Sequence, residues 1–245
     1  MNRLRITPSV IPNMFTAMNM FSGFLSVIYT SQGKFYDAAW LIIVGAIFDA
    51  LDGFMARLTH SSSELGVELD SLSDIVSFGA APAFLIYSVY LHQFNTVGIL
   101  ISSLLLLAGG FRLARFNVQL VGFDKAFFKG LPIPSSGIMM SAFVLAFYKP
   151  GLGFPERLQT FIIPLVVILA YLMVSNIKYD TLPQFTFKGF IEKPFYIIII
   201  PVCILLLIFT PPAAALFYTF VFIIVFGIFR TILNFVFKQK KHKTG

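Results

Sequence analysis

Long apolar segments alternate with short polar connections along the whole chain. Most of these segments approach the length of about 20 apolar residues that an α-helix needs to cross a bilayer. The seventh is short, and Pro211-Pro212 predicts a tight turn after it, because proline interrupts a helix. The pattern predicts an all-α polytopic membrane bundle. Eight segments are expected, at about residues 12–31, 37–57, 68–91, 96–117, 133–149, 158–175, 195–210 and 213–235.

The composition is also typical of an integral membrane protein. The 245 residues are 58% hydrophobic and only 12% charged, with a mean hydropathy of +0.86. A soluble protein of this size carries roughly twice that share of charge. The net charge of +7 could suggest nucleic acid, but the cations are dispersed among the connections, so no nucleic-acid partner is expected. The single cysteine, Cys203, excludes an internal disulfide.

The distribution of cations predicts the orientation in the membrane. If the first residues are cytoplasmic and all eight segments cross, only Lys34, Lys149 and Arg157 of the 18 lysines and arginines lie outside. Such a bias follows the positive-inside rule. It predicts a cytoplasmic-membrane protein with both termini and the site described next facing the cytoplasm. The chain is expected to form one transmembrane domain over residues 1–245, with a core at about 10–175 and further helices at about 195–237.

Acidic residues gather where the second and third segments meet. Asp49 and Asp52 are three residues apart, and Asp70 and Asp74 are four apart, so each pair lies on one helix face. The two segments form an antiparallel hairpin, which is expected to bring the pairs face to face. Carboxylate oxygens suit Mg²⁺ or Mn²⁺, and four carboxylates can hold two ions about 4 Å apart, an arrangement used in phosphoryl displacement.

Small residues and one cation accompany the aspartates. Gly53, Ala56 and Gly66 are expected to leave room for a flat group to approach the backbone, and Arg57 could contact a pyrophosphate. A structural ion pair is one alternative for an intramembrane aspartate. A proton- or cation-coupled transporter is another, because such pathways also use membrane carboxylates. The chain shows no internal repeat of the kind that marks secondary transporters.

The complete pattern resembles a family signature. Asp49-x₂-Asp52-Gly53-x₂-Ala56-Arg57-x₈-Gly66-x₃-Asp70-x₃-Asp74 matches every specified position in the signature of the CDP-alcohol phosphatidyltransferases. That resemblance implies a membrane enzyme with a six-helix core, here with two further helices, and a homodimer. It also implies transfer of a phosphatidyl group from CDP-diacylglycerol to an alcohol with release of CMP.

The resemblance assigns roles to individual residues. It implies that the four aspartates bind two divalent metals, and that Asp74 also acts as the general base that deprotonates the acceptor hydroxyl. The positions that it implies for contacts with CDP-diacylglycerol are Gly53, Arg57, Ser63 and the early stretch Pro12-Asn13-Met-Phe-Thr16.

The acceptor alcohol is predicted from two later stretches. Residues 111–117 (FRLARFN) and 128–136 (FKGLPIPSS) resemble the phosphatidylserine synthases of this family, which implies L-serine as acceptor. Arg112 and Arg115 could hold the carboxylate of an amino acid, with Asn117 and Ser135 as hydrogen-bonding partners; anchoring to lipid headgroups is the alternative for the arginines. Glycerol phosphate, inositol phosphate or choline as acceptor, and an archaeal ether lipid as donor, stay open.

Overall fold

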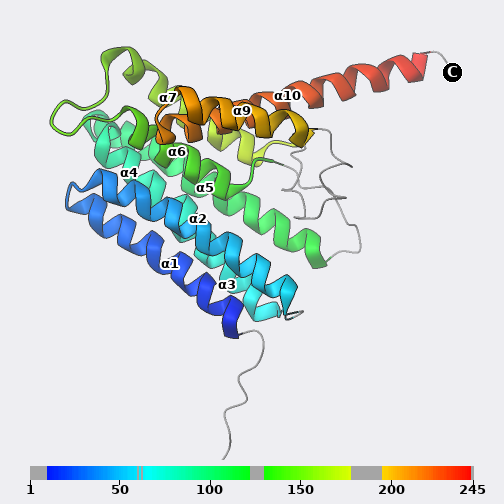
Figure 1. The fold of residues 1–245 in the computed structure, drawn as a ribbon, viewed down its shortest axis with the longest axis horizontal. Coiled ribbons are helices and arrows are strands. Elements are labelled where there is room, and N and C mark those ends of the chain that lie inside the picture. Colours follow the sequence, from blue (N-terminus) through cyan, green and yellow to red (C-terminus); the bar gives the residue numbers. More distant parts are fainter. Residues whose placement is uncertain (1–9, 60, 62, 122–129, 178–194, 244–245) are drawn as a thin grey trace, which may run out of the picture.

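The computed structural model describes residues 10–59, 61, 63–121, 130–177 and 195–243. All long elements in this part of the chain are helices (Figure 1). A π-helical turn, η1 (Ile75–Ala80), joins α3 to α4, and a short 3₁₀ turn, η2 (Leu91–Phe94), precedes α5. The α-helices are α1 (Val10–Ser31), α2 (Phe35–Leu58), α3 (Glu64–Asp74), α4 (Ala81–Val89), α5 (Asn95–Val121), α6 (Ile133–Phe147), α7 (Glu156–Val174), α9 (Phe195–Phe209) and α10 (Pro212–Lys243).

The predicted all-α membrane bundle is confirmed. Among the described residues, six helical stretches are long and apolar enough to cross a membrane, and α6 and α9 are shorter apolar helices of 15 residues each. The third predicted segment begins earlier than expected, at Glu64, and runs through α3, η1 and α4 as one stretch. The last helix continues past the predicted end, to Lys243, because its polar tail keeps the helical backbone.

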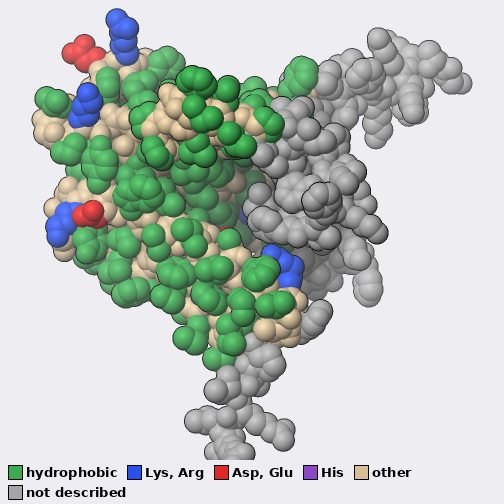
Figure 2. All heavy atoms as spheres, viewed as in Figure 1, with side chains coloured by type: hydrophobic (Ala, Val, Ile, Leu, Met, Phe, Trp, Pro, Cys, Tyr) green, Lys and Arg blue, Asp and Glu red, His purple; other side chains and the backbone are tan. Residues whose placement is uncertain are grey.

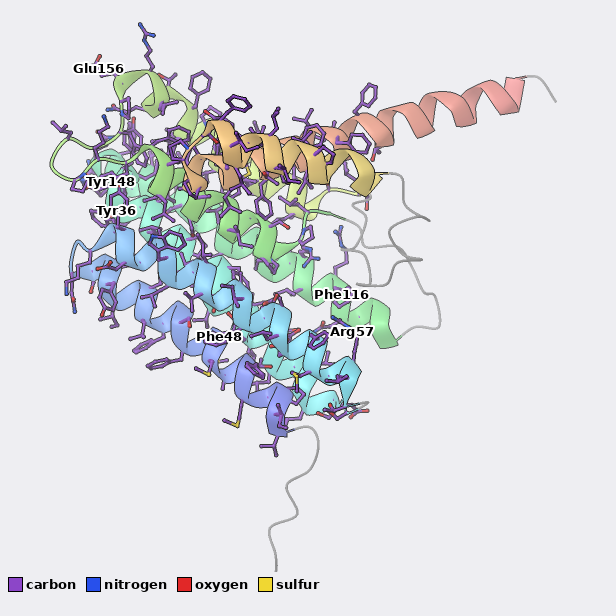
Figure 3. The ribbon with its side chains drawn as sticks, viewed as in Figure 1. Tyr36, Phe48, Arg57, Phe116, Tyr148 and Glu156 are labelled. Atoms are coloured by element: carbon purple, nitrogen blue, oxygen red, sulfur yellow. The ribbon has the colours of Figure 1, made fainter. Side chains whose placement is uncertain are left out.

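Each crossing starts at the end of the molecule where the previous one finished. Figure 3 marks these two ends. We call the end near Arg57 and Phe116 the motif end, and the end near Tyr36, Tyr148 and Glu156 the far end. A broad hydrophobic surface separates them, with most of the visible charged side chains near its edges (Figure 2). This distribution is the one a bilayer requires, because charged side chains are costly at membrane depth.

Helix α1 turns its polar residues inward. Met14, Phe21 and Phe24 are each more than half exposed on its outer side. The buried side is made of small and polar residues, which let neighbouring backbones approach closely, as is common between membrane helices. These buried residues are Pro12, Thr16, Asn19, Ser22, Gly23, Ser26 and Thr30.

The α3–η1–α4 stretch lies at the centre of the bundle, and two glycines allow its close packing. A Cβ atom at Gly23 of α1 would lie 2.6 Å from the Cα of Ser77, and one at Gly137 of α6 would lie 3.0 Å from the Cα of Phe78. The hydroxyl of Ser77 donates to the backbone oxygen of Asn19 (2.8 Å). Helix α3 and η1 are therefore fixed against α1, and the residues that they carry are held in place.

Candidate active site

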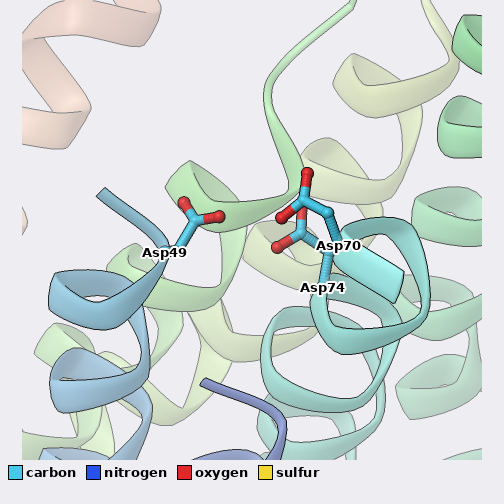
Figure 4. A group of neighbouring side chains, drawn as sticks. All are labelled: Asp49, Asp70 and Asp74. Atoms are coloured by element: carbon cyan, nitrogen blue, oxygen red, sulfur yellow. The ribbon is translucent and has the colours of Figure 1, made fainter. Parts of the chain in front are cut away.

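Three of the four motif aspartates come together at the meeting of α2 and α3. Asp49 lies on α2 and faces Asp70 and Asp74 of α3 (Figure 4). One carboxylate oxygen from each lies within 4.8 Å of the other two. We call these three residues the acid cluster. The helical spacing and the antiparallel hairpin bring them together as the sequence predicted.

The fourth aspartate, Asp52, is not a member of this cluster. Its Oδ2 accepts a hydrogen bond from the hydroxyl of Thr16 on α1 (2.8 Å), and both residues are buried. Thr16 in turn accepts at its backbone oxygen a hydrogen bond from Ser73 of α3 (3.0 Å). Asp52 and Thr16 thus link α1 to α2 directly beside the acid cluster.

The acid cluster holds three carboxyl groups close together, with oxygens buried from solvent. Asp74 is only 7% exposed, and Oδ1 of Asp74 and Oδ1 of Asp70 have no hydrogen-bond partner among the described residues. Buried carboxylates this close repel one another and need a counter-charge. Oxygen donors from several carboxylates are the ligands that Mg²⁺ and Mn²⁺ prefer, so the residues present fit a divalent ion.

Asn13, Ser63 and Gly66 lie next to one another at the start of α3. Ser63 caps this helix, because its hydroxyl accepts a hydrogen bond from the backbone N–H of Gly66 (3.1 Å). A Cβ atom at Gly66 would lie 3.1 Å from Oγ of Ser63 and 3.2 Å from Oδ1 of Asn13. The small size of Gly66 therefore accommodates these two side chains, whereas the sequence analysis expected it to leave room for a ligand.

Gly53 has more space around it. Among the described residues, a Cβ atom there would meet only Nη1 of Arg57 within 4 Å, at 3.5 Å. Ala56 is partly buried and Arg57 is exposed on the last turn of α2 (Figure 3). This face of α2 is therefore open in the way expected for a group that approaches Gly53 and Arg57.

The two arginines of α5 have different surroundings. Arg112 is 8% exposed, its guanidinium interacts electrostatically with Asp74, and its Nε has no hydrogen-bond partner among the described residues. Arg115 instead donates to the backbone oxygens of Val174 (2.9 Å) and Ser175 (3.3 Å), at the end of α7. Arg112 therefore faces the acid cluster, and the printed bonds of Arg115 lead to the end of α7, whereas the sequence suggested the same role for both arginines.

The end of α7 also binds the residues that directly precede α6. The backbone N–H of Gly130 donates to the oxygen of Ile177 (2.8 Å), and that of Leu131 donates to the oxygen of Leu172 (3.0 Å). Gly130 has a φ of +89°, and a Cβ atom there would collide with the backbone oxygen of Met173. Arg115 and this glycine turn together fix α7 to α5 and α6 at the motif end.

Asn117 and Ser135 lie near this end on different helices. The amide of Asn117 donates to the hydroxyl of Ser71 (3.1 Å), the residue that follows Asp70. Ser135 lies in the first turn of α6 and is partly buried. His60 lies outside the described residues, while Glu64 and Glu68 are exposed on α3.

Two serines of the third segment hold it against α1, a role that the sequence did not predict. Ser73 and Ser77, four residues apart, both donate to backbone oxygens of α1 (3.0 Å to Thr16 and 2.8 Å to Asn19). The signal that could have found them is their helical spacing on one face of an apolar segment, next to Asp70 and Asp74. Hydrogen bonds of this kind are a usual way for membrane helices to associate.

Comparisons with known proteins match this chain to one enzyme family. The chain matches the CDP-alcohol phosphatidyltransferase family over residues 9–175, from the N-terminal end of α1 to the end of α7. It is 36% identical over 237 residues to the CDP-diacylglycerol–serine O-phosphatidyltransferase of Helicobacter pylori strain J99, covering 95% of this chain and 96% of the relative.

Two further relatives come from other organisms. An archaetidylserine synthase of Methanothermobacter thermautotrophicus is 39% identical over 182 residues, covering 73% of each chain. A CDP-diacylglycerol–serine O-phosphatidyltransferase of Bacillus subtilis is 35% identical over 170 residues, covering 69% of this chain and 89% of the relative. With a family match over most of its length and the signature aspartates meeting in space, the chain belongs to the CDP-alcohol phosphatidyltransferase family.

Proposed function

We propose that this protein transfers the phosphatidyl group of CDP-diacylglycerol to L-serine and releases CMP. The observation that carries the proposal is the acid cluster, which joins Asp49 of α2 to Asp70 and Asp74 of α3 beside the buried Arg112. The acceptor is supported by relatives that are named for serine and match almost the whole chain.

The acid cluster is proposed to hold divalent metal, Mg²⁺ or Mn²⁺, with Asp52 completing the set of four ligands. When bound, such ions neutralise the pyrophosphate of the donor and the CMP that leaves. The observation that fits this role is the pair of buried carboxylate oxygens, on Asp70 and Asp74, that lack protein partners. For Asp52 to bind metal as well, it would either give up the hydrogen bond that Oδ2 accepts from Thr16 or bind the ion through its other oxygen.

Asp74 is proposed to take the proton of the serine hydroxyl. The serine oxygen then attacks the phosphorus that carries diacylglycerol, and the bond from that phosphorus to the bridging oxygen breaks, so that CMP leaves with both electrons. Asp74 suits this role because it is held between the hydrogen bonds of Ser73 and Ser77 to α1 and has one oxygen without a protein partner. General-base catalysis of this kind contributes roughly 10²–10⁴-fold to rate.

Arg112 is proposed to bind the carboxylate of serine. Its Nε lacks a hydrogen-bond partner, and the residue lies next to Asp74, so an amino acid held there would present its hydroxyl to the base. Arg115 is assigned a supporting role at the end of α7. Asn117 is proposed to act through its bond to Ser71, and Ser135 is kept as a candidate contact at the start of α6.

The cytidine diphosphate part of the donor is proposed to lie over the open face of α2. Gly53 admits it closely, and the exposed Arg57 at the same end can reach a phosphate. Asn13, Thr16, Ser63 and Gly66 border this face from α1 and α3, where Ser63 and Gly66 are fixed by the helix cap.

The orientation and the assembly are part of the same proposal. The cation bias of the sequence supports a cytoplasmic site and cytoplasmic termini, and the family resemblance supports a homodimer. Tags at both termini should be accessible in inside-out vesicles and protected in right-side-out vesicles. Accessibility of the two tags from opposite sides would contradict an even number of crossings.

The function is tested by measuring CMP release from purified protein. CDP-diacylglycerol is supplied with L-serine, glycerol 3-phosphate, inositol phosphate or choline in separate reactions. We expect CMP release to depend on L-serine, with phosphatidylserine as the lipid product. Faster release with another acceptor would overturn the serine assignment and leave the family assignment intact. A CDP-activated ether lipid tested in parallel measures whether the enzyme accepts an archaeal type of donor.

A further inference from the structure

Asn19 of α1 differs from the other polar residues on the buried face of that helix. It is 0% exposed, and neither Oδ1 nor Nδ2 of its amide has a hydrogen-bond partner among the described residues. Ser22 and Ser26 on the same face donate to backbone oxygens, of Met18 (2.8 Å) and Ala38 (2.9 Å). A primary amide buried without protein partners is rare, and each instance calls for an explanation.

The amide lies one helical turn beneath the acid cluster. A Cβ atom at Gly45 of α2 would be 3.0 Å from Oδ1 of Asn19, and Asp49 follows Gly45 by one turn. The backbone oxygen of Asn19 accepts the hydroxyl of Ser77, which lies three residues beyond Asp74. Asn19 is therefore placed where α1 meets α2, which carries Asp49, and η1, which directly follows Asp74.

The contact of Thr16 with Asp52 also locates Asn19 along the axes of α1 and α2. Thr16 is one turn before Asn19 on α1 and binds Asp52 (2.8 Å), whereas Asn19 faces Gly45, which precedes Asp52 by two turns. Because α1 and α2 run antiparallel (Figure 1), the contacts of Thr16 with Asp52 and of Asn19 with Gly45 place Asp49 at a level between them. Asn19 is thus on the side of the cluster that faces the far end, and Thr16 is on the side of the motif end.

The chemistry of an amide suits a bridge in this place. It offers two donors and two acceptor lone pairs, and Oδ1 of Asp74 is likewise buried without a protein partner. Buried polar groups that lack protein partners are usually connected by ordered water, which needs two to four polar neighbours. Groups that hydrogen-bond to metal-binding side chains orient them and commonly change metal affinity 10- to 100-fold when removed.

We propose that Asn19 is a positioning residue for the acid cluster, whose amide binds water beneath Asp49 and Asp74 and thereby sets the affinity of the cluster for divalent metal. The inference rests on the proposed function, because it takes the acid cluster to be the metal site. Asn19 acts through the carboxylates and does not itself touch substrate.

The test measures Mn²⁺ binding to purified protein in the absence of substrates, from the electron paramagnetic resonance signal of free Mn²⁺. We expect Asn19→Ala to weaken Mn²⁺ binding by about 10- to 100-fold. Ser26→Ala is the matched control: Ser26 is also 0% exposed on the same face of α1 and loses a hydrogen bond, but it lies two turns farther from the cluster. Its affinity for Mn²⁺ should stay at the wild-type value.

Two further variants separate a bridging role from packing. Asn19→Leu keeps a similar shape without polar atoms and should weaken Mn²⁺ binding like Asn19→Ala; it replaces that variant if the smaller residue prevents folding. Asn19→Ser keeps a donor and an acceptor and leaves space for water, so it should recover most of the lost affinity. Lower thermal stability with unchanged Mn²⁺ affinity in Asn19→Ala and Asn19→Leu would overturn the inference and leave Asn19 as a packing residue.

Asp49→Asn shows which proposal has failed. If Asp49→Asn binds Mn²⁺ as the wild-type protein does, the acid cluster is not the metal site and the proposed metal site fails first. If Asp49→Asn loses Mn²⁺ but Asn19→Ala keeps it, the metal site stands and only the role of Asn19 is wrong.

Discussion

The two ends of the bundle differ in the kind of polar group that they bury. At the far end, the hydroxyl of Tyr36 donates to the backbone oxygen of Tyr148 (2.7 Å), and the ring of Tyr148 packs against Phe35 and Phe154 at centroid distances of 5.5 and 5.6 Å (Figure 3). At the motif end, one oxygen each of Asp70 and Asp74 is buried without a hydrogen-bond partner in the described part of the chain. The hydroxyl of Thr30, at the far-end terminus of α1, is also buried without a partner among the described residues, but it is neutral, whereas the unpartnered oxygens of the motif end belong to carboxyl groups.

This difference separates stability from function. A buried hydrogen bond or aromatic contact stabilises the fold, whereas a buried carboxylate without a partner destabilises it. Such groups persist in membrane segments where they bind ions or substrates. We therefore expect changes at the motif end to affect activity more than stability, and changes at the far end to do the reverse.

Metal removal should produce the largest effect. An excess of chelator should abolish CMP release, because Arg112 is then the one cation described beside three carboxyl groups and the pyrophosphate is not neutralised by metal. Added Mg²⁺ or Mn²⁺ should restore the rate, measured as CMP formed per minute. Unchanged turnover in excess chelator would contradict the metal assignment and remove the main functional difference between the two ends.

Asp74→Asn should come next, with turnover lower by at least roughly 10²-fold from the loss of a general base. Its thermal stability should change little, because the relief of repulsion among three carboxyl groups is offset by the lost attraction to the buried Arg112. Asp37→Asn, an exposed aspartate in the first turn of α2 at the far end, is the control and should keep wild-type turnover. Near-wild-type turnover of Asp74→Asn would mean that another residue is the base.

The two arginines of α5 are expected to differ in the same way, one affecting substrate binding and the other stability. Arg112→Ala should raise the KM for serine roughly 10- to 100-fold, the consequence of losing one charge-assisted hydrogen bond of about 1.5–3 kcal/mol, and leave the KM for CDP-diacylglycerol nearly unchanged. Arg115→Ala removes bonds to the end of α7, so it should lower thermal stability and change the serine KM less.

Steady-state kinetics with each substrate varied in turn distinguish these outcomes. A higher KM for the lipid with an unchanged KM for serine in Arg112→Ala would make Arg112 a headgroup or pyrophosphate contact. Equal increases in the serine KM in both variants would show that Arg115 shares the site, as the sequence analysis expected.

Tyr36→Phe should have the smallest effect. It removes only the hydroxyl that bonds to Tyr148, which is worth about 0.5–1.5 kcal/mol, or roughly 1–6 °C in Tm for a chain of this size. Turnover and both KM values should match the wild type, measured beside the Tm in the same detergent. A loss of activity without a loss of Tm would show that the far end takes part in function.

Much of the fold follows from the sequence alone. The positions of the apolar segments give the helices to within a few residues for most elements, because a backbone in lipid has to satisfy its own hydrogen bonds and forms helices where the chain is apolar. The motif spacing likewise places Asp70 and Asp74 together. Residues four apart differ by only about 40° around a helix with 3.6 residues per turn, so they face one neighbour.

For pairs of residues that are three apart, tertiary packing decided which neighbour each residue contacts. Such residues differ by about 60° around the helix and can face different neighbours. Asp49 joins the acid cluster while Asp52 binds Thr16. Likewise, Arg112 faces Asp74 while Arg115 binds the end of α7.

The sequence by itself determined the class of fold, the approximate helix boundaries and the set of residues from which the site is built. Only the tertiary structure decided which of them meet, and that the space beside Gly66 is filled by Asn13 and Ser63. Periodicity fixes the angle between side chains on one helix. The rotation of each helix about its axis depends on close contacts with others, such as Gly23 against Ser77, and those contacts join residues far apart in the sequence.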